Sequence, residues 1–282
     1  MKHHKSLTLA ALTAAAALTL TACGGGGGDD NGGGGSGDSD KVRIGIKYDQ
    51  PGLGFKDGDK YTGFDVDVAR YIAKDLGYDE NQIEWVESPS ANRENMLSNG
   101  QVDMIVATYS ITDQRKQSVG FAGPYFVAGQ DLLVKADNTS IKGPEDLEGK
   151  NLCSVTGSTS AQKIKDQYAG GVNLVEQSGY ADCVTMLGSG GVDAVTTDDI
   201  ILAGLAATDA NKGKFKVVGH PFTEEKYGVG IPKDSDKCKA INDAISKMID
   251  DGSWEKAVKS NTEGADYQYN TELNPPKPDE CA

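Results

Sequence analysis

The chain has 282 residues and a formal net charge of −14 at pH 7, with 28 Lys and Arg side chains against 42 Asp and Glu. This acidic balance argues against a nucleic-acid partner, because binding a polyanion requires basic patches that release counterions. Two of the three histidines lie at positions 3 and 4, which leaves His220 and argues against a Ser-His-Asp triad or a multi-histidine metal site. We expect no metal and no cofactor.

The first residues predict export. A basic stretch ends at Lys5, and a run of Ala, Leu and Thr over residues 7–22 follows, as in the n-region and h-region of a secretory signal. The threonines make this run too polar for a membrane span, which needs about 20 clearly apolar residues. The run ends in LTAC, which resembles a lipobox, so we expect a lipoprotein signal peptide over 1–22 and a lipid on Cys23 that anchors the chain to the cell membrane. An ordinary signal peptide with an incidental cysteine is the alternative.

Residues 23–40 are mostly Gly with a few Asp, Ser and Asn, which cannot bury a core and predict a flexible tether. The folded part then begins at Lys41. Its roughly 240 residues suffice for one large domain or for two lobes that each have a core.

The first half of the folded part alternates strand and helix patterns. Residues 42–46 have the period-two alternation of a half-buried strand. Residues 64–76 repeat apolar side chains every four positions, with Asp65 and Asp67 in the first turn and Gly77 after the last, as a helix does. Further elements are expected as a strand at 83–86, a short helix at 92–99 and a buried strand at 102–107.

The second half repeats this alternation. It predicts strands near 152–155, 172–175 and 192–197, with helices at 160–168 and 180–187. Such alternation is typical of parallel sheets with helices on both faces, in which ligands bind at the carboxyl ends of strands.

Polar residues follow the buried strand 102–107. Hydroxyls at Thr108 and Ser110, together with free backbone N–H groups, precede Arg115. This set suits a carboxylate, which an arginine can hold with two parallel hydrogen bonds. The alternative is a helix cap at Thr112 with Arg115 on a solvated face.

Two more strand ends carry polar groups. Ser158 and Thr159 stand between a predicted strand and a helix, where they can bind an anion or simply cap the helix. Asp198 and Asp199 end the strand 192–197, where a carboxylate can receive an α-ammonium group or cap the next helix.

Four cysteines remain besides Cys23. An even number in an exported chain favours two disulfides, with three possible pairings, and four reduced thiols are the alternative. These cysteines are Cys153, Cys183, Cys238 and Cys281.

Several segments together resemble a known family. The segment GFDVDVA at 63–69 is similar to the signature of the polar amino-acid solute-binding proteins (family 3) of ABC importers, and the resemblance spans residues 42–262. Other segments in the family's order and spacing are ITDQRK (111–116), FAGPY (121–125) and VDAVTTD (192–198). Within the family, the chain looks most like the glutamate-binding lipoproteins of Gram-positive bacteria, through KYDQPG (47–52), ESPSA (87–91) and DMIVATYS (103–110).

The resemblance implies a periplasmic-binding-protein-like type II fold, in which two α/β lobes are joined by two crossover hinges. Lobe 1 would comprise residues 41–126 plus 226–282, and lobe 2 residues 131–222. On this map Cys153 shares lobe 2 with Cys183, and Cys238 shares lobe 1 with Cys281, so we favour these two pairings.

The resemblance also implies roles for the strand-end residues. Arg115 would clamp the α-carboxylate of an amino acid, with help from Ser110 and from the turn at Ser158 and Thr159. Asp198 would receive the α-ammonium group.

Related glutamate and aspartate binders place basic residues at the positions matching Lys47 and Arg93, aimed at the side-chain carboxylate. A second buried anion needs a second positive partner, which these two residues would supply. A solvated Arg93 paired with Glu94 or Glu87 is the alternative. Thr197 stands where glutamine binders have a histidine, which leaves any contact at that position open.

We therefore expect the extracytoplasmic substrate-binding subunit of an ABC amino-acid importer. It would be a monomer that performs no chemistry, binds L-glutamate in the cleft between two closing lobes and delivers it to membrane permease subunits. Alternatives are aspartate or glutamine as the ligand, a dehydratase-like enzyme on the same fold, or the sensory ectodomain of a receptor. The receptor would need a transmembrane helix and a signalling domain after Ala282.

Overall fold

The computed structural model describes residues 41–168 and 171–281. The predicted signal peptide (1–22), the lipid site at Cys23 and the predicted tether (23–40) lie outside these ranges. In the described part of the chain, none of the helices combines the length and the apolar character that a membrane crossing requires.

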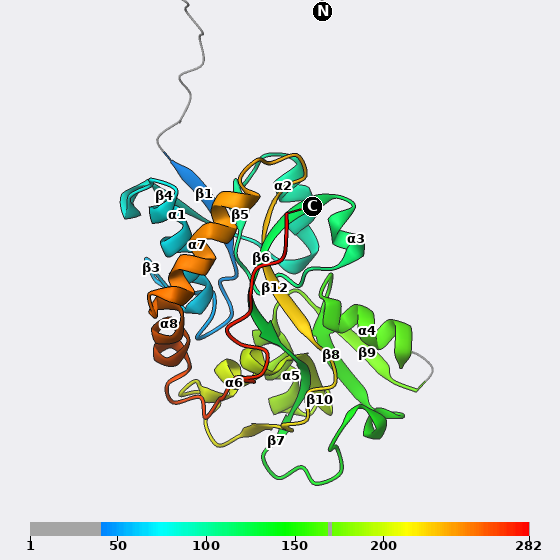
Figure 1. The fold of residues 1–282 in the computed structure, drawn as a ribbon. Coiled ribbons are helices and arrows are strands. Elements are labelled where there is room, and N and C mark those ends of the chain that lie inside the picture. The colour runs from blue at the N-terminus through cyan, green and yellow to red at the C-terminus, as the bar shows by residue number, and fades with distance from the viewer. Residues whose placement is uncertain (1–40, 169–170, 282) are drawn as a thin grey trace, which may run out of the picture. The chain divides into compact units, whose positions relative to one another are not determined.

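A five-stranded sheet forms the first lobe, in the order β4-β1-β5-β12-β6 (Figure 1). β1 is parallel to β4 and β5, whereas β12 is antiparallel to β5 and β6. The strands are β1 (Val42–Ile46), β4 (Ile83–Glu87), β5 (Met104–Ile105), β6 (Val119–Ala128) and β12 (Glu225–Pro232).

Apolar clusters lie on both faces of this sheet, because successive side chains of a strand point to opposite faces. Met104 belongs to the cluster that holds Phe64 and Trp254, whereas Ile105 packs with Leu97. The helices of this lobe are α1 (Phe64–Asp75), α2 (Arg93–Ser98), α3 (Asp113–Lys116), α7 (Cys238–Asp250) and α8 (Ser253–Thr262), with 3-10 turns at Glu80–Gln82 and Ser90–Asn92 and a hairpin of β2 (Phe55–Asp57) and β3 (Lys60–Thr62).

The second lobe has its own five-stranded sheet, in the order β11-β7-β10-β8-β9. β8 is parallel to β9 and β10, and β7 is antiparallel to β10 and β11. The strands are β7 (Gln130–Lys135), β8 (Asn151–Val155), β9 (Asn173–Gln177), β10 (Ala194–Asp198) and β11 (Phe215–Val217), and the helices are α4 (Thr159–Gln167), α5 (Tyr180–Ser189), α6 (Asp199–Ala207) and a 3-10 turn at Pro144–Leu147.

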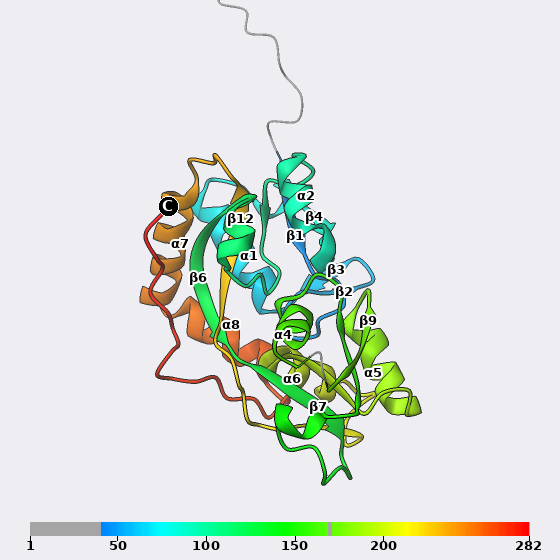
Figure 2. The same cartoon turned by 90° about the vertical axis from the view of Figure 1, so that its right-hand side faces the viewer.

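The chain passes between the lobes twice. β6 ends at Ala128 and β7 begins at Gln130, so only Gly129 separates strands of the two sheets (Figure 2). The chain returns through residues 218–224 to β12 and completes the first sheet. The predicted fold class is therefore confirmed, while the predicted lobe boundaries (41–126 with 226–282, and 131–222) stay predictions.

The buried strand expected over residues 102–107 is shorter in the structure. The N–H of Val106 still donates to the carbonyl of Gly45 at 2.9 Å. The N–H of Thr108, by contrast, donates to the Asp65 carboxylate at 2.9 Å. Sheet pairing therefore ends where a side chain replaces the neighbouring strand as the hydrogen-bond partner.

Both favoured disulfide pairings are present in the structure. Cys153 of β8 is bonded to Cys183 of α5, with their Cα atoms 5.5 Å apart. Cys238 at the start of α7 is bonded to Cys281, with a Cα separation of 5.9 Å. Each bond stays within one lobe, and the second attaches the C-terminal segment to the first lobe.

Replacing Cys153 and Cys183 together by Ala should lower the free energy of unfolding by about 3 to 4 kcal/mol, because the bond closes a loop of about 30 residues. Urea unfolding of the exported protein under non-reducing conditions measures this loss. As a control, wild type and the double variant are compared again after both are reduced. The difference in their free energies of unfolding should then shrink, because the wild type has lost the same bond. Equal stability of the oxidised proteins would contradict the expectation.

Candidate functional site

Residues of both lobes line one small cavity. It includes six of the eight predicted ligand-binding residues, whereas Lys47 and Ser110 do not line it directly. Its lining consists of Gln50, Ser90, Arg93, Thr108, Arg115, Ser158, Thr159, Ser160, Tyr180, Thr197, Asp198 and Ile201. Within the described ranges, no group of His, Cys, Asp and Glu side chains is arranged to hold a metal ion.

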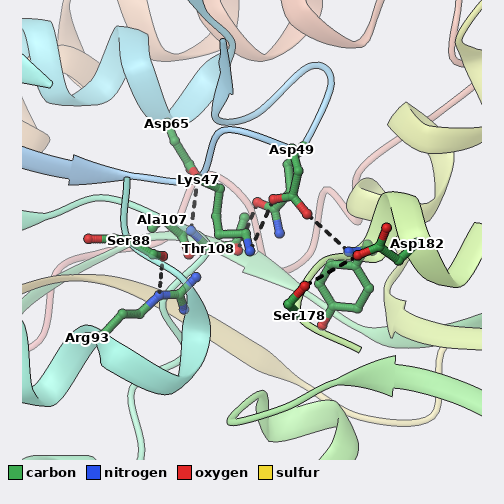
Figure 3. A network of polar contacts seen from close by, with 11 residues as sticks. Lys47, Asp49, Asp65, Ser88, Arg93, Ala107, Thr108, Ser178 and Asp182 are labelled. Carbon is green, nitrogen blue, oxygen red and sulfur yellow. Dashed lines mark hydrogen bonds and ion pairs between the residues drawn. The ribbon is translucent and has the colours of Figure 1, made fainter. Parts of the chain in front are cut away.

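Thr108 forms one wall in a strained conformation. Its φ of 46° lies in the left-handed region, which costs a β-branched residue energy. Asp65 holds it there, because one carboxylate oxygen accepts from the Thr108 N–H at 2.9 Å (Figure 3). The other carboxylate oxygen accepts from the Tyr125 hydroxyl at 2.7 Å. The Thr108 hydroxyl lies 3.2 Å from the Gln50 side-chain oxygen, to which it donates. Burial raises the pKa of Asp65 to about 6, although both hydrogen bonds oppose this shift.

Arg115 is buried and lies on α3 behind an N-cap at Thr112, so the predicted cap is present but the alternative of a solvated arginine is wrong. Its two terminal nitrogens donate to the carbonyls of Ser110 (2.8 Å) and Gly157 (3.1 Å), and its Nε lies 3.3 Å from a Glu94 carboxylate oxygen. A guanidinium has five N–H donors. In the described part of the chain these contacts occupy three of them, so two are left for a ligand.

Arg93 is 2 % exposed, and its Nη2 has no hydrogen-bond partner among the described residues. Its Nε donates weakly to the Ser88 carbonyl at 3.4 Å. The alternative of a solvated Arg93 is therefore wrong, and Glu94 contacts Arg115 instead. A buried donor without a partner costs about 1 to 3 kcal/mol, and more when it is charged.

The two arginines share one aromatic neighbour. The guanidinium carbons of Arg93 and Arg115 lie 5.0 and 4.8 Å from the ring centroid of Tyr109, within range of cation–π attraction. Burial and the positive charge of Arg115 lower the pKa of Arg93. Two buried cations this close repel each other, so a negatively charged group in the cavity would stabilise both.

Asp198 supplies the opposite charge at the end of β10. One carboxylate oxygen accepts from the Tyr227 hydroxyl at 2.6 Å, and the other, Oδ1, has no partner in the described ranges. Burial and nearby Glu225 raise the pKa of Asp198 well above its usual range. Asp199 instead accepts a hydrogen bond of 2.7 Å from the backbone N–H of Ile200, so its carboxylate satisfies a backbone donor in the first turn of α6. An ammonium group would satisfy Asp198.

The start of α4 meets the first lobe at the cavity. The Ser158 hydroxyl accepts from the Ala161 N–H at 2.9 Å, so Ser158 is an N-cap, as its alternative interpretation stated. The Thr159 hydroxyl lies 3.2 Å from that of Ser110, across the two lobes. These hydroxyls and the N–H groups of the first turn form an electropositive wall beside Arg115.

Lys47 is 3 % exposed and already has a protein partner, because its Nζ lies 3.1 Å from Oδ1 of Asp49 (Figure 3). Burial lowers the pKa of Lys47, and Asp49 opposes this shift. The charge of the Lys47 ammonium is therefore already compensated by Asp49, and Lys47 does not line the cavity.

Sequence reasoning did not single out Gln50, Ser90 or Tyr180, which also line the cavity. Gln50 and Ser90 follow the carboxyl ends of β1 and β4, so the strand-end rule could have found them. Tyr180 begins a helix and offered no such signal. The role of Asp65 was also missed, because sequence reasoning used this residue only as a first-turn acid that marks the start of a helix.

The model of the bacterial extracellular solute-binding proteins, family 3, matches residues 42–262 of the chain. The glutamate-binding protein GluB of Corynebacterium efficiens is 49 % identical over 246 residues, which is 83 % of this chain and 82 % of that protein. The glutamine-binding protein GlnH of Bacillus subtilis, an ABC transporter component, is 42 % identical over 226 residues, covering 79 % and 81 %.

Solved structures show the same fold. An ancestral arginine-binding protein bound to glutamine superimposes with a TM-score of 0.72 at 36 % identity, covering 78 % of this chain and 97 % of that one. The ligand-binding core of GluR0 from Nostoc punctiforme, in complex with L-glutamate, gives a TM-score of 0.68 at 26 % identity and covers 78 % and 98 %.

The raised pKa of Asp65 makes a pH-dependent prediction. A pKa of about 6 in the folded state, against 3.8 in the unfolded state, means that protonation of Asp65 stabilises the fold. This contribution is complete below pH 3.8 and is lost as the pH rises through 6. Relative to Asp65→Asn, the wild type should therefore lose up to about 3 kcal/mol of unfolding free energy between pH 4 and pH 7.

Urea unfolding of both proteins across this pH range measures the difference. Asp57→Asn, in the exposed β2–β3 hairpin, corrects for the loss of one negative charge. A difference between wild type and Asp65→Asn that stays constant with pH would show that Asp65 does not titrate in this range.

Proposed function

Because the chain belongs to the bacterial extracellular solute-binding proteins of family 3, we propose that it is the substrate-binding subunit of an ABC amino-acid importer and binds L-glutamate between its two lobes. The observation that carries this proposal is a pair of buried atoms that have no hydrogen-bond partner among the described residues. Arg93 Nη2 is a hydrogen-bond donor and Asp198 Oδ1 is an acceptor, and both residues line the same cavity. An amino acid with a second carboxylate can satisfy both.

Each end of the ligand has a counterpart. The α-ammonium group binds Asp198 Oδ1, for which residues 41–168 and 171–281 supply no donor. The α-carboxylate takes the two remaining N–H groups of Arg115 and faces Ser158 and Thr159 at the start of α4. Ser110 of the first lobe supports this wall through its contact with Thr159. The distal carboxylate binds Arg93.

Glutamate is favoured over glutamine because the distal end of the cavity contains a cation. A carboxylate accepts hydrogen bonds from a guanidinium, whereas the NH₂ of an amide would face another donor and leave buried groups unpaired. Glutamine is the second candidate, because Asp49 already compensates the charge of Lys47 and leaves Arg93 as the main distal cation. The glutamine-binding relative, at 42 % identity, also supports it.

The matched family and the named relatives are binding proteins, so the chain is a binding protein and not an enzyme. The family is extracellular, which places the chain outside the cytoplasm. We further propose that a lipid on Cys23 holds it at the cell membrane, that residues 23–40 let it move there, and that it acts as a monomer. One lobe (residues 41–126 with 226–282) and the other (residues 131–222) would then close around the ligand, and the closed protein would dock on the permease subunits.

Arg115→Ala should abolish the binding of every amino acid tested, because the α-carboxylate is common to all of them. Removing one partner of a buried charge pair costs about 2 to 5 kcal/mol, a factor of about 30 to several thousand in affinity. Calorimetric titration with glutamate and glutamine measures the loss. Near-wild-type affinity for either ligand would remove Arg115 from the site.

The wild type should prefer glutamate over glutamine by about two orders of magnitude or more. Arg93→Met should remove most of this preference, because it weakens glutamate strongly and changes glutamine little. Arg70→Met is the matched control, because this partly exposed arginine of α1 does not line the cavity, and it should leave both affinities unchanged. Equal weakening of both ligands by Arg93→Met would instead make Arg93 an α-carboxylate or structural residue.

A further inference from the structure

Asp49 lies in the loop after β1 and makes two contacts that no ligand role explains. Oδ1 lies 3.1 Å from the Nζ of Lys47 in its own lobe. Oδ2 accepts a hydrogen bond of 3.0 Å from the backbone N–H of Tyr180, which belongs to the second lobe (Figure 3). One carboxylate therefore joins a buried cation of the first lobe to a helix of the second.

The contact in the second lobe is at a helix end that needs a partner. α5 begins at Tyr180, and its N-cap residue, Gly179, has no side chain with which to cap it. The first N–H groups of a helix have no partner within the helix and favour negative charge. Asp182, in the first turn, lies 3.3 Å from the Ser178 hydroxyl, from which it accepts. Asp49 thus caps Tyr180 from the other lobe.

Gly179 leaves the room that this contact requires. A Cβ added at Gly179 would lie 2.6 Å from Asp49 Oδ2, which is closer than real Cβ atoms approach. The backbone at Gly179 is extended (φ −141°, ψ 156°), so alanine can adopt its conformation. An alanine there would displace the Asp49 carboxylate and leave the helix backbone in place.

We propose that Asp49 is a positioning residue that latches the closed lobes together and fixes Lys47 at the same time. The proposal rests on the proposed function, because a ligand enclosed between two lobes can enter only when the lobes part. The bond from Tyr180 to Asp49 must then break on opening and form again on closure. It stabilises the closed state and slows the escape of the ligand.

The test is a double-mutant cycle with Asp49→Ala and Gly179→Ala in the full exported protein. The measured quantities are the association and dissociation rates of L-glutamate. Asp49→Ala should weaken glutamate about tenfold or more, through faster dissociation and with little change in association. Gly179→Ala should act in the same direction in the wild type and have no further effect on Asp49→Ala. Asp49→Asn, whose amide oxygen can still accept from Tyr180, should recover part of the affinity.

Independent effects of Asp49→Ala and Gly179→Ala would overturn the latch, and so would a loss confined to the association rate. Hydrogen exchange at the Tyr180 amide reads the same contact directly, and Asp49→Ala should speed it without changing exchange in β8. If the wild type bound no amino acid while exchange at Tyr180 still depended on Asp49, the proposed function would fail and the contact would stand. Normal glutamate binding with unchanged exchange at Tyr180 would leave the function intact and refute the latch.

Discussion

A charged group buried away from water costs several kcal/mol unless other groups pair with it. The cavity between the lobes contains three such groups, and the protein satisfies each of them only in part. Within the part of the chain that the structure describes, Arg115 has two N–H groups without an acceptor, Arg93 has a terminal nitrogen without a partner, and Asp198 has a carboxylate oxygen without a donor. The specificity that we propose follows from this shortage, because a small zwitterion with a second carboxylate brings the missing partners. The ligand-free protein bears the cost, and binding relieves it.

The fold makes this arrangement possible by bringing the ends of strands from two sheets to one place. Asp198 ends β10 of the second lobe, and Thr108 follows β5 of the first. Buried side chains that contact Thr108 and Asp198 hold these two residues in place. Asp65 keeps Thr108 in its left-handed conformation, and Tyr227, on a strand that returns from the second lobe, orients Asp198. The same residues that shape the site therefore also connect it to the core.

The alternation of strand and helix patterns is a local property and predicted the α/β architecture, whereas its division into two lobes came from the resemblance to a family. Strand ends followed by polar residues also identified Thr108, Ser158 and Asp198, while Lys47 and Arg93 came from the resemblance to a family. Contacts between distant parts of the chain were not predictable in this way. Asp49 and Tyr180 are 131 residues apart, and Asp65 and Thr108 are 43 apart. No periodicity relates such pairs, so the partner of Lys47 and the inward direction of Asp65 came only from the structure.

The most direct test of this account is a crystal structure of the protein grown with L-glutamate. We expect the ligand in the cavity between the lobes, with its ammonium group within hydrogen-bond distance of Asp198 Oδ1 and its distal carboxylate at Arg93 Nη2. Both buried atoms would then have the partners that the described residues do not supply. Glutamate bound elsewhere, or bound in the cavity with either atom still unpaired, would contradict the claim that these two groups define the site.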